Sequence, residues 1–212
     1  MTPDIHLGAG CATVVLTHLL YLHGFRSSPQ SFKARRLAAW LQAHRPEVQW
    51  WCPQLPPSPQ AAWTLISQGI ADWPVQTMAV VGSSLGGFYA TAVAQSRGCR
   101  ALLLNPAIDP ARDLSRYIGE QTEFHRPQAR FEFRAEYVDE LRALKVAEIT
   151  RPERYSAIIA KGDEVLDWRE MCDRYKGANI RLLEASDHAL SDFEAHLDFV
   201  LEVLGLRLWV RL

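Results

Sequence analysis

The chain has 212 residues, of which 48% are hydrophobic and 22% are charged. This balance is typical of a globular protein, and the length predicts one domain with its own apolar core. The formal net charge of −1, with 23 Lys and Arg against 24 Asp and Glu, argues against a dedicated nucleic-acid-binding protein, which would carry a basic excess.

The first 18 residues differ from the rest of the chain. They show no clear hydrophobic period and contain Gly8 and Gly10, so we expect a loosely attached extension over 1–18 and a folded domain over 19–212.

No apolar run reaches the roughly 18 residues of a membrane span. The stretch 11–22 has no Lys or Arg before it, unlike a secretory signal peptide, and we therefore expect a cytoplasmic protein without a membrane partner.

Strand and helix patterns alternate from the start of this domain to its end. Short apolar and β-branched runs predict strands at residues 13–22, 48–52, 78–82, 101–105, 156–160 and 179–184. Amphipathic or small-residue patterns predict helices at residues 28–45, 60–72, 84–97 and 191–204. This alternation favours an α/β fold with a mostly parallel sheet of about six strands and helices on both faces.

Capping residues define two of these helices. Ser28 is expected to be the N-cap of the first helix, with Pro29 as its first residue. In the last helix, Ser191 and Glu194 have the spacing of a capping box, and Gly205 is expected to end the helix.

The segment 107–155 interrupts the alternation. It is charged, contains scattered aromatic residues, shows no clear strand pattern, and has a helical period only around 137–144. An insertion of this length between two core strands commonly has a function, and we expect it to form a small helical lid.

The most informative motif is the G-x-S-x-G sequence Gly82–Gly86, which follows a predicted strand and opens a predicted helix. In this context a sharp strand-to-helix turn exposes the hydroxyl of the central serine, here Ser84. A glycine two residues to either side leaves room for so tight a turn. We therefore predict that Ser84 is a nucleophile. A phosphate-binding loop is disfavoured because no Gly-Lys-Ser/Thr follows.

A serine hydroxyl needs a base to act as a nucleophile. In hydrolases with this turn, an acid and then a histidine follow the serine along the chain. His188, between the last strand and the last helix, is the predicted base. Asp163, just after the strand 156–160, is the predicted acid that orients it, and Asp167 is the alternative.

The developing oxyanion needs backbone N–H donors. One is expected from Leu85, which follows the nucleophile, and the other from the His23-Gly24-Phe25 loop after the first strand. Phe25 is our choice for the second donor, with His23 holding the loop. Gly24 and Phe25 are also expected to contact the substrate.

The sequence offers little support for metal or cofactor chemistry. No His-x-x-x-His or comparable ligand spacing occurs, so we predict neither a metal nor a cofactor. The cysteines contain no C-x-x-C pair and are far apart, which argues against a zinc knuckle, a disulfide framework or a cysteine-based redox site; they are Cys11, Cys52, Cys99 and Cys172.

Several motifs together resemble the YqiA/YcfP-like small bacterial esterases of the α/β-hydrolase superfamily. The matching segments, in chain order, are Tyr21–Pro29, Gly82–Ala90, Asn105–Ala107, Gly162–Asp167 and Asp187–His188. The resemblance covers residues 19–206. It implies an α/β-hydrolase fold, a serine esterase or thioesterase with Ser84, Asp163 and His188 as its triad, and a place for Asn105 beside the site, in contact with substrate.

The expected function is hydrolysis of a small acyl ester or thioester through an acyl-enzyme intermediate. An acyl transferase or a C–C hydrolase could use the same triad. A binding module could also retain the fold without catalysis.

Overall fold

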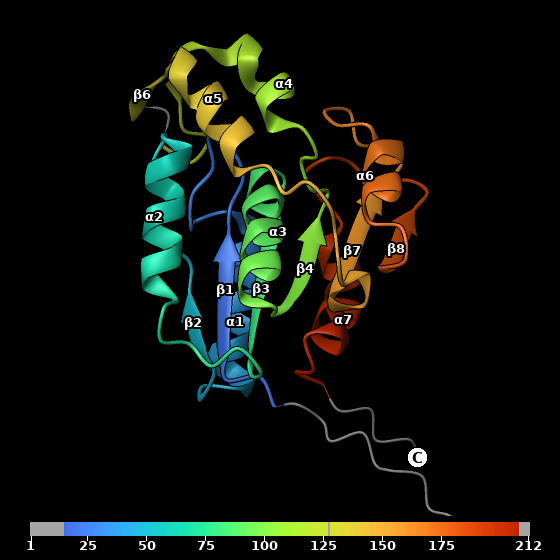
Figure 1. Cartoon of the computed structure of the whole chain (residues 1–212). Coiled ribbons are helices and arrows are strands. Elements are labelled where there is room, and N and C mark those ends of the chain that lie inside the picture. The colour runs from blue at the N-terminus through green and yellow to red at the C-terminus, as the bar shows by residue number, and fades with distance from the viewer. Residues whose placement is uncertain (1–14, 127, 208–212) are drawn as a thin grey trace, which may run out of the picture.

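The computed structural model describes residues 15–126 and 128–207 (Figure 1). Its centre is a six-stranded sheet in the order β2-β1-β3-β4-β7-β8, in which every neighbouring pair is parallel. The strands are β1 (His18–Leu22), β2 (Gln49–Trp51), β3 (Met78–Ser83), β4 (Arg100–Leu104), β7 (Tyr155–Ala160) and β8 (Asn179–Leu183). The predicted parallel sheet of about six strands is confirmed.

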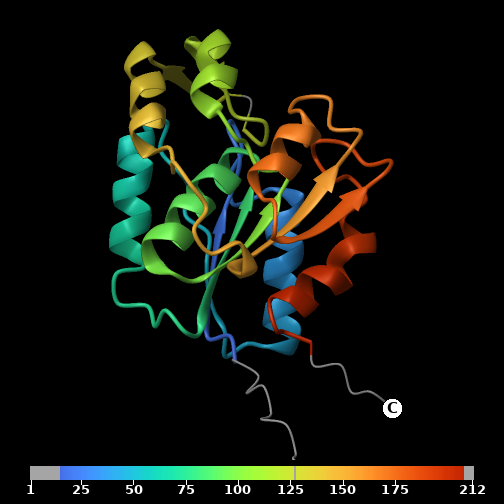
Figure 2. The same ribbon diagram turned by 45° about the vertical axis from the view of Figure 1, so that its right-hand side comes forward.

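Helices cover both faces of the sheet (Figure 2). One face carries α1 (Phe32–His44) and α7 (Phe193–Val203), and the other carries α2 (Pro59–Gly69), α3 (Leu85–Arg97) and α6 (Trp168–Arg174). Successive strand side chains point to opposite faces. In β1, Leu19 and Tyr21 therefore join the core beneath α1 and α7, whereas Leu20 and Leu22 join the core beneath α2 and α3.

The first helix begins later than predicted. The Ser28 hydroxyl accepts a hydrogen bond from the Gln30 N–H at 3.1 Å, which places Ser28 and Pro29 in a turn before the helix. The N-cap of α1 is Ser31, whose side chain makes no capping hydrogen bond. The predicted N-cap at Ser28 and helix start at Pro29 are therefore wrong, because the Ser28 hydroxyl is used in a local turn instead.

The predicted capping box of the last helix is wrong. The Ser191 hydroxyl donates to Asp187 at 2.6 Å, and Glu194 pairs with Arg36 on α1. Both side chains are thus used in contacts outside the first turn of α7. The predicted end is confirmed, because Gly205 follows the helix in the left-handed region with φ 69°.

The insertion contains a β-hairpin that the sequence patterns did not indicate. Its elements are α4 (Pro110–Leu114), short 3-10 turns at Ser115–Tyr117 and Pro152–Arg154, β5 (Gly119–Thr122), β6 (Arg130–Phe133) and α5 (Ala135–Leu144). β5 and β6 pair antiparallel. β5 (GEQT) has no large apolar residue, and the alternation in β6 (RFEF) is only four residues long. Phe133, Val138 and Leu141 are buried in the main core. In Figure 1 the insertion lies at the carboxyl ends of β1, β3 and β4.

The folded region starts slightly before residue 19. Leu16 is fully buried, the Thr17 N–H donates to the Thr77 carbonyl at 2.8 Å, and His18 is the first residue of β1. These residues therefore belong to the fold rather than to a loose extension. Residues 1–14 of the expected extension lie outside the described residues. No helix in the described ranges is long and apolar enough to cross a bilayer.

Candidate active site

Ser84 lies at the turn between β3 and α3 in a strained conformation. Its φ of 54° and ψ of −120° are rare for a residue with a side chain. Neighbouring backbone holds it there: the Ser84 N–H donates to the Leu104 carbonyl at 3.0 Å, and the Ser84 carbonyl accepts from Gly87 at 2.8 Å and Ala107 at 3.0 Å. The surrounding strands therefore impose the turn that the motif predicts.

The glycines of the motif make this turn possible. A Cβ on Gly82 would overlap the Gly86 carbonyl and lie 2.6 Å from the Ala90 Cβ. A Cβ on Gly86 would overlap the Leu22 carbonyl. Since real Cβ atoms do not approach backbone so closely, α3 can pack against β1 and β3 only with glycine at both positions.

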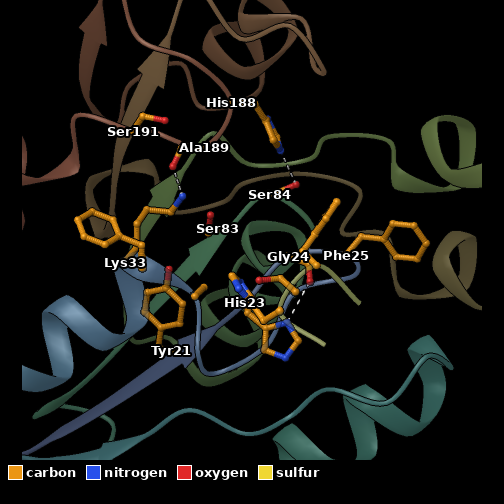
Figure 3. Close-up of a pocket in the computed structure, with 15 residues that line it drawn as sticks. Tyr21, His23, Gly24, Phe25, Lys33, Ser83, Ser84, His188, Ala189 and Ser191 are labelled. Atoms are coloured by element: carbon orange, nitrogen blue, oxygen red, sulfur yellow. Dashed lines mark hydrogen bonds between the residues drawn. The ribbon is translucent and has the colours of Figure 1, made fainter. Parts of the chain in front are cut away.

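The three residues predicted to act together do lie together. His188 Nε2 is 3.0 Å from Ser84 Oγ (Figure 3). His188 Nδ1 is 2.8 Å from Asp163 Oδ2. A tautomer with the proton on Nδ1 donates to the carboxylate and leaves Nε2 free to accept the serine proton. The Asp163 side chain is fully buried, whereas the His188 side chain is 20% exposed.

The structure distinguishes the two candidate acids. The second oxygen of Asp163, Oδ1, accepts from the N–H groups of Val165 and Leu166, each at 2.8 Å. Asp167 caps α6 by accepting from the Arg169 N–H at 2.8 Å, and its side chain is half exposed. The geometry therefore favours Asp163 as the partner of His188.

Asn105, which is expected to contact substrate, is fully buried. Its side-chain NH₂ donates to the carbonyls of Asp187 and His188 at 3.0 and 3.1 Å, and its Oδ1 accepts from the Ala160 N–H at 2.8 Å. It therefore ties the histidine loop to the end of β7. The Glu164 carboxylate, which the sequence did not single out, accepts from the His188 N–H at 3.0 Å.

The loop after β1 lies directly over the nucleophile. A Cβ on Gly24 would be 3.2 Å from Ser84 Cβ and 3.6 Å from its Oγ, so only backbone fits there comfortably. His23 holds this loop: its Nε2 accepts from the Leu55 N–H at 3.1 Å, which leaves Nδ1 to donate to the Gly24 carbonyl at 3.0 Å. Burial lowers the pKa of His23, which favours this neutral form.

Two N–H groups are candidates to hold an oxyanion, that of Leu85, which follows Ser84, and that of Phe25, which follows Gly24. Leu85 is the first residue of α3, so its N–H has no partner within the helix. The Phe25 N–H makes no backbone hydrogen bond within the described part of the chain. These are the two donors that the sequence predicts for an oxyanion.

Two cavities meet at Ser84 and His188. The larger, of about 500 Å³, includes Gly24 and Phe25 in its lining. The smaller, of about 160 Å³, lies beneath the insertion and also contains Phe25. Phe124 lines both cavities and is 62% exposed. A reacting group at Ser84 thus has space on two sides.

The comparisons with known proteins place the chain in a family. A model described as "Uncharacterised protein family (UPF0227)" matches residues 18–205. The chain belongs to the UPF0227 family. This is the YcfP/YqiA family that the sequence motifs resemble.

Solved structures show that this UPF0227 protein has the α/β-hydrolase fold. Alpha/beta hydrolase domain-containing protein 10 from mouse is 14% identical, with a TM-score of 0.65 over 88% of this chain and 90% of that one. Est1E from Butyrivibrio proteoclasticus is 13% identical, with a TM-score of 0.62 over 91% and 86%. An esterase from Pyrococcus furiosus is 14% identical, with a TM-score of 0.60 over 91% and 82%.

The insertion of this UPF0227 protein is attached to the loop after β1. Arg26 donates through Nε to the Thr122 carbonyl at 2.8 Å, and its guanidinium lies 4.6 Å from the centre of the Phe124 ring. Phe25 packs edge-on against Phe133, with ring centres 5.2 Å apart. The predicted lid is therefore packed against the site rather than separated from it.

The described residues include no group of three or more His, Cys, Asp or Glu side chains arranged to hold a metal ion.

Cys52, Cys99 and Cys172 are free thiols. Burial raises the pKa of Cys99 to about 11 and that of Cys52 to about 12. Both thiols are therefore protonated near neutral pH, which makes them poor nucleophiles.

Proposed function

We propose that this protein is a serine hydrolase that cleaves small carboxylic esters or thioesters through an acyl-enzyme intermediate. The observation that carries the proposal is the continuous chain of two hydrogen bonds, Ser84 to His188 at 3.0 Å and His188 to Asp163 at 2.8 Å. It occurs at a strained turn in an α/β-hydrolase fold, which is the usual setting for a serine nucleophile.

In the first step, Ser84 Oγ attacks the carbonyl carbon of the substrate while His188 Nε2 takes the serine proton. Asp163 keeps the imidazole in the required orientation and stabilises its positive charge. The negative charge that develops on the carbonyl oxygen is held by the N–H groups of Leu85 and Phe25. The dipole at the N-terminus of α3 also favours this charge.

In the second half of the reaction, the tetrahedral intermediate collapses and the alkoxide or thiolate leaves with the proton from His188. Ser84 then carries the acyl group. His188 next removes a proton from water, which attacks the acyl carbon, and the carboxylic acid is released as Ser84 regains its proton. Each step uses only side-chain and backbone groups of this protein and water, so the proposed reaction needs no cofactor.

The cavities support a small-molecule substrate. The volume of about 500 Å³ beside Ser84 is within the usual range for small-ligand sites, and the second cavity gives room for the other half of an ester. Phe25, Leu85 and Phe124 line one or both cavities, so apolar surface is available to a substrate beside Ser84.

The test is a panel of acyl esters and thioesters of graded chain length, with Ser84→Ala as the control. Loss of the nucleophile should reduce kcat on the order of 10⁶-fold. A Ser84→Ala enzyme within about tenfold of wild type would show that the assignment is wrong. A competing alcohol or amine that intercepts the acyl group would reveal a transferase. Failure of a fluorophosphonate probe to label Ser84 would favour a binding module.

A further inference from the structure

Lys33 places a buried cation at one end of the larger cavity. It is the second residue of α1, lines the cavity that contains Ser84, and is only 9% exposed. Its ammonium donates to the Ala189 carbonyl. The two lysine ion pairs found in the described ranges are those of Lys145 and Lys161, so no carboxylate there neutralises Lys33.

Such an ammonium is unusual because a buried charge is normally paired or fully hydrogen-bonded. Burial lowers the pKa of Lys33 to about 8, although the charges of Asp187 and Asp163 act in the opposite direction. Lys33 therefore remains mostly protonated at neutral pH. The ammonium has three N–H donors, of which the Ala189 carbonyl uses one, so among the residues that the structure describes two have no acceptor.

Hydroxyl groups from three elements gather at the same end of the cavity. They belong to Tyr21 on β1, Ser31 before α1 and Ser83 at the end of β3, and all three residues line the cavity. Tyr21 Oη and Ser31 Oγ are buried and have no hydrogen-bond partner among the residues that the structure describes. The Tyr21 hydroxyl lies next to those of Ser31 and Ser83, so the three form one polar cluster.

The position of this cluster relative to Ser84 limits what it can bind. In Figure 3, Tyr21, Lys33 and Ser83 lie to one side of Ser84 and Phe25 lies to the other. Lys33 binds the carbonyl of Ala189, the residue after His188, and lines the same cavity of about 500 Å³ as Ser84. A small molecule whose carbonyl is at Ser84 can therefore extend toward the cluster. A single ammonium with neutral hydroxyls matches a monoanion, whereas a phosphate dianion is usually met by arginine or several backbone N–H groups.

We propose that Lys33, with the hydroxyls of Tyr21 and Ser31, forms a subsite for a carboxylate on the substrate. The preferred substrates are then esters or thioesters that carry a free carboxylate close to the scissile carbonyl. This specificity rests on the proposed hydrolase function, because it assigns part of the same cavity. The carboxylate could belong to the acyl part or to the leaving group, and the experiment separates these two cases.

The kinetic test compares substrates that differ only in carboxylate against carboxamide. Ethyl hydrogen succinate and ethyl succinamate vary the acyl part, and 3-carboxyphenyl acetate and 3-carbamoylphenyl acetate vary the leaving group. In one of the two pairs, wild type should favour the carboxylate by about tenfold or more in kcat/KM, as expected for a charge-assisted hydrogen bond. Lys33→Met should abolish that ratio. Arg35→Met, which removes an exposed cation from the same helix, should leave the ratio unchanged.

The ratio is the useful quantity because Lys33→Met also removes the hydrogen bond to the Ala189 carbonyl, beside His188. A purely structural role would lower both members of each pair alike. The subsite is therefore wrong if neither pair shows a preference in wild type, or if Lys33→Met preserves the preference.

A binding measurement separates this inference from the proposed function. Calorimetric titration of Ser84→Ala with N-ethylsuccinamic acid and its neutral diamide, and with 3-acetamidobenzoic acid and its amide, needs no hydrolysis. Binding that favours the carboxylate and depends on Lys33 would support the subsite even if wild type cleaved no ester. Equal or absent binding of both members of each pair would overturn it, even if wild type proved to be an esterase.

Discussion

Replacing Asn105 with glycine is expected to lower the free energy of unfolding by about 3 to 5 kcal/mol. The side chain makes three hydrogen bonds in a fully buried site, to the carbonyls of Asp187 and His188 and from the N–H of Ala160. Each bond contributes about 1 kcal/mol, and the buried Ala160 N–H left without an acceptor costs about 1 to 2 kcal/mol more. This loss is a large fraction of the stability of a typical domain.

A matched pair of variants separates hydrogen bonding from backbone strain. Asn105 has φ 43°, in the left-handed region that asparagine and glycine tolerate. Asn105→Gly loses the three hydrogen bonds without strain, whereas Asn105→Ala loses them and also costs about 1 to 2 kcal/mol for the left-handed conformation. Alanine should therefore be the less stable of the two variants, although it usually stabilises relative to glycine.

Urea unfolding followed by tryptophan fluorescence measures both differences and does not depend on knowing the substrate. The midpoints should fall in the order wild type, Asn105→Gly and Asn105→Ala, with the slope m unchanged. A loss below about 1 kcal/mol for Asn105→Gly would refute the assigned hydrogen bonds. Equal stability of the two variants would refute the assigned strain.

Three further results are expected. Asp163→Asn should reduce kcat for ester hydrolysis about 10⁴-fold, because the imidazole loses its orienting acceptor. Asp167→Asn should change kcat by less than about tenfold. A larger loss of kcat for Asp167→Asn than for Asp163→Asn would exchange the roles of the two residues. Gly86→Ala should lower the free energy of unfolding, measured with urea, by about 3 kcal/mol or more, because the added Cβ overlaps the Leu22 carbonyl. A variant that unfolds at the same urea concentration as wild type would contradict this packing. As the pH rises from about 8 to 10.5, the free energy of unfolding of wild type should increase relative to that of Lys33→Met by up to about 3 kcal/mol. The reason is that over this range the lysine stays protonated in the unfolded chain but loses its proton in the folded one. A constant difference between the two proteins over this range would argue against the buried ammonium.

Local sequence patterns were sufficient for the order of elements in the core. The apolar runs of the parallel strands and the small residues of α3 predict an α/β sheet because their patterns follow from burial on both faces. The sequence around Ser84 also predicts the strand-to-helix turn, since glycine at 82 and 86 is what so close a backbone approach requires.

Local patterns failed where a side chain had more than one possible partner. Ser191 and Glu194 have the spacing of a capping box, but Asp187 and Arg36 bind them instead. The sequence did not indicate the β5–β6 hairpin because its strands have only four residues each, and their conformation depends on pairing and on the packing of Phe133 on the core.

The sequence by itself determined the type of fold. It also determined the order along the chain of the serine, acid and histidine of the candidate active site. Only the tertiary structure decided between Asp163 and Asp167, which lie four residues apart in the same loop. It also placed Asn105 behind the histidine loop and Lys33 inside the cavity. The physical reason is that hydrogen-bond partners and burial depend on contacts between residues distant in sequence, whereas backbone patterns depend mainly on near neighbours.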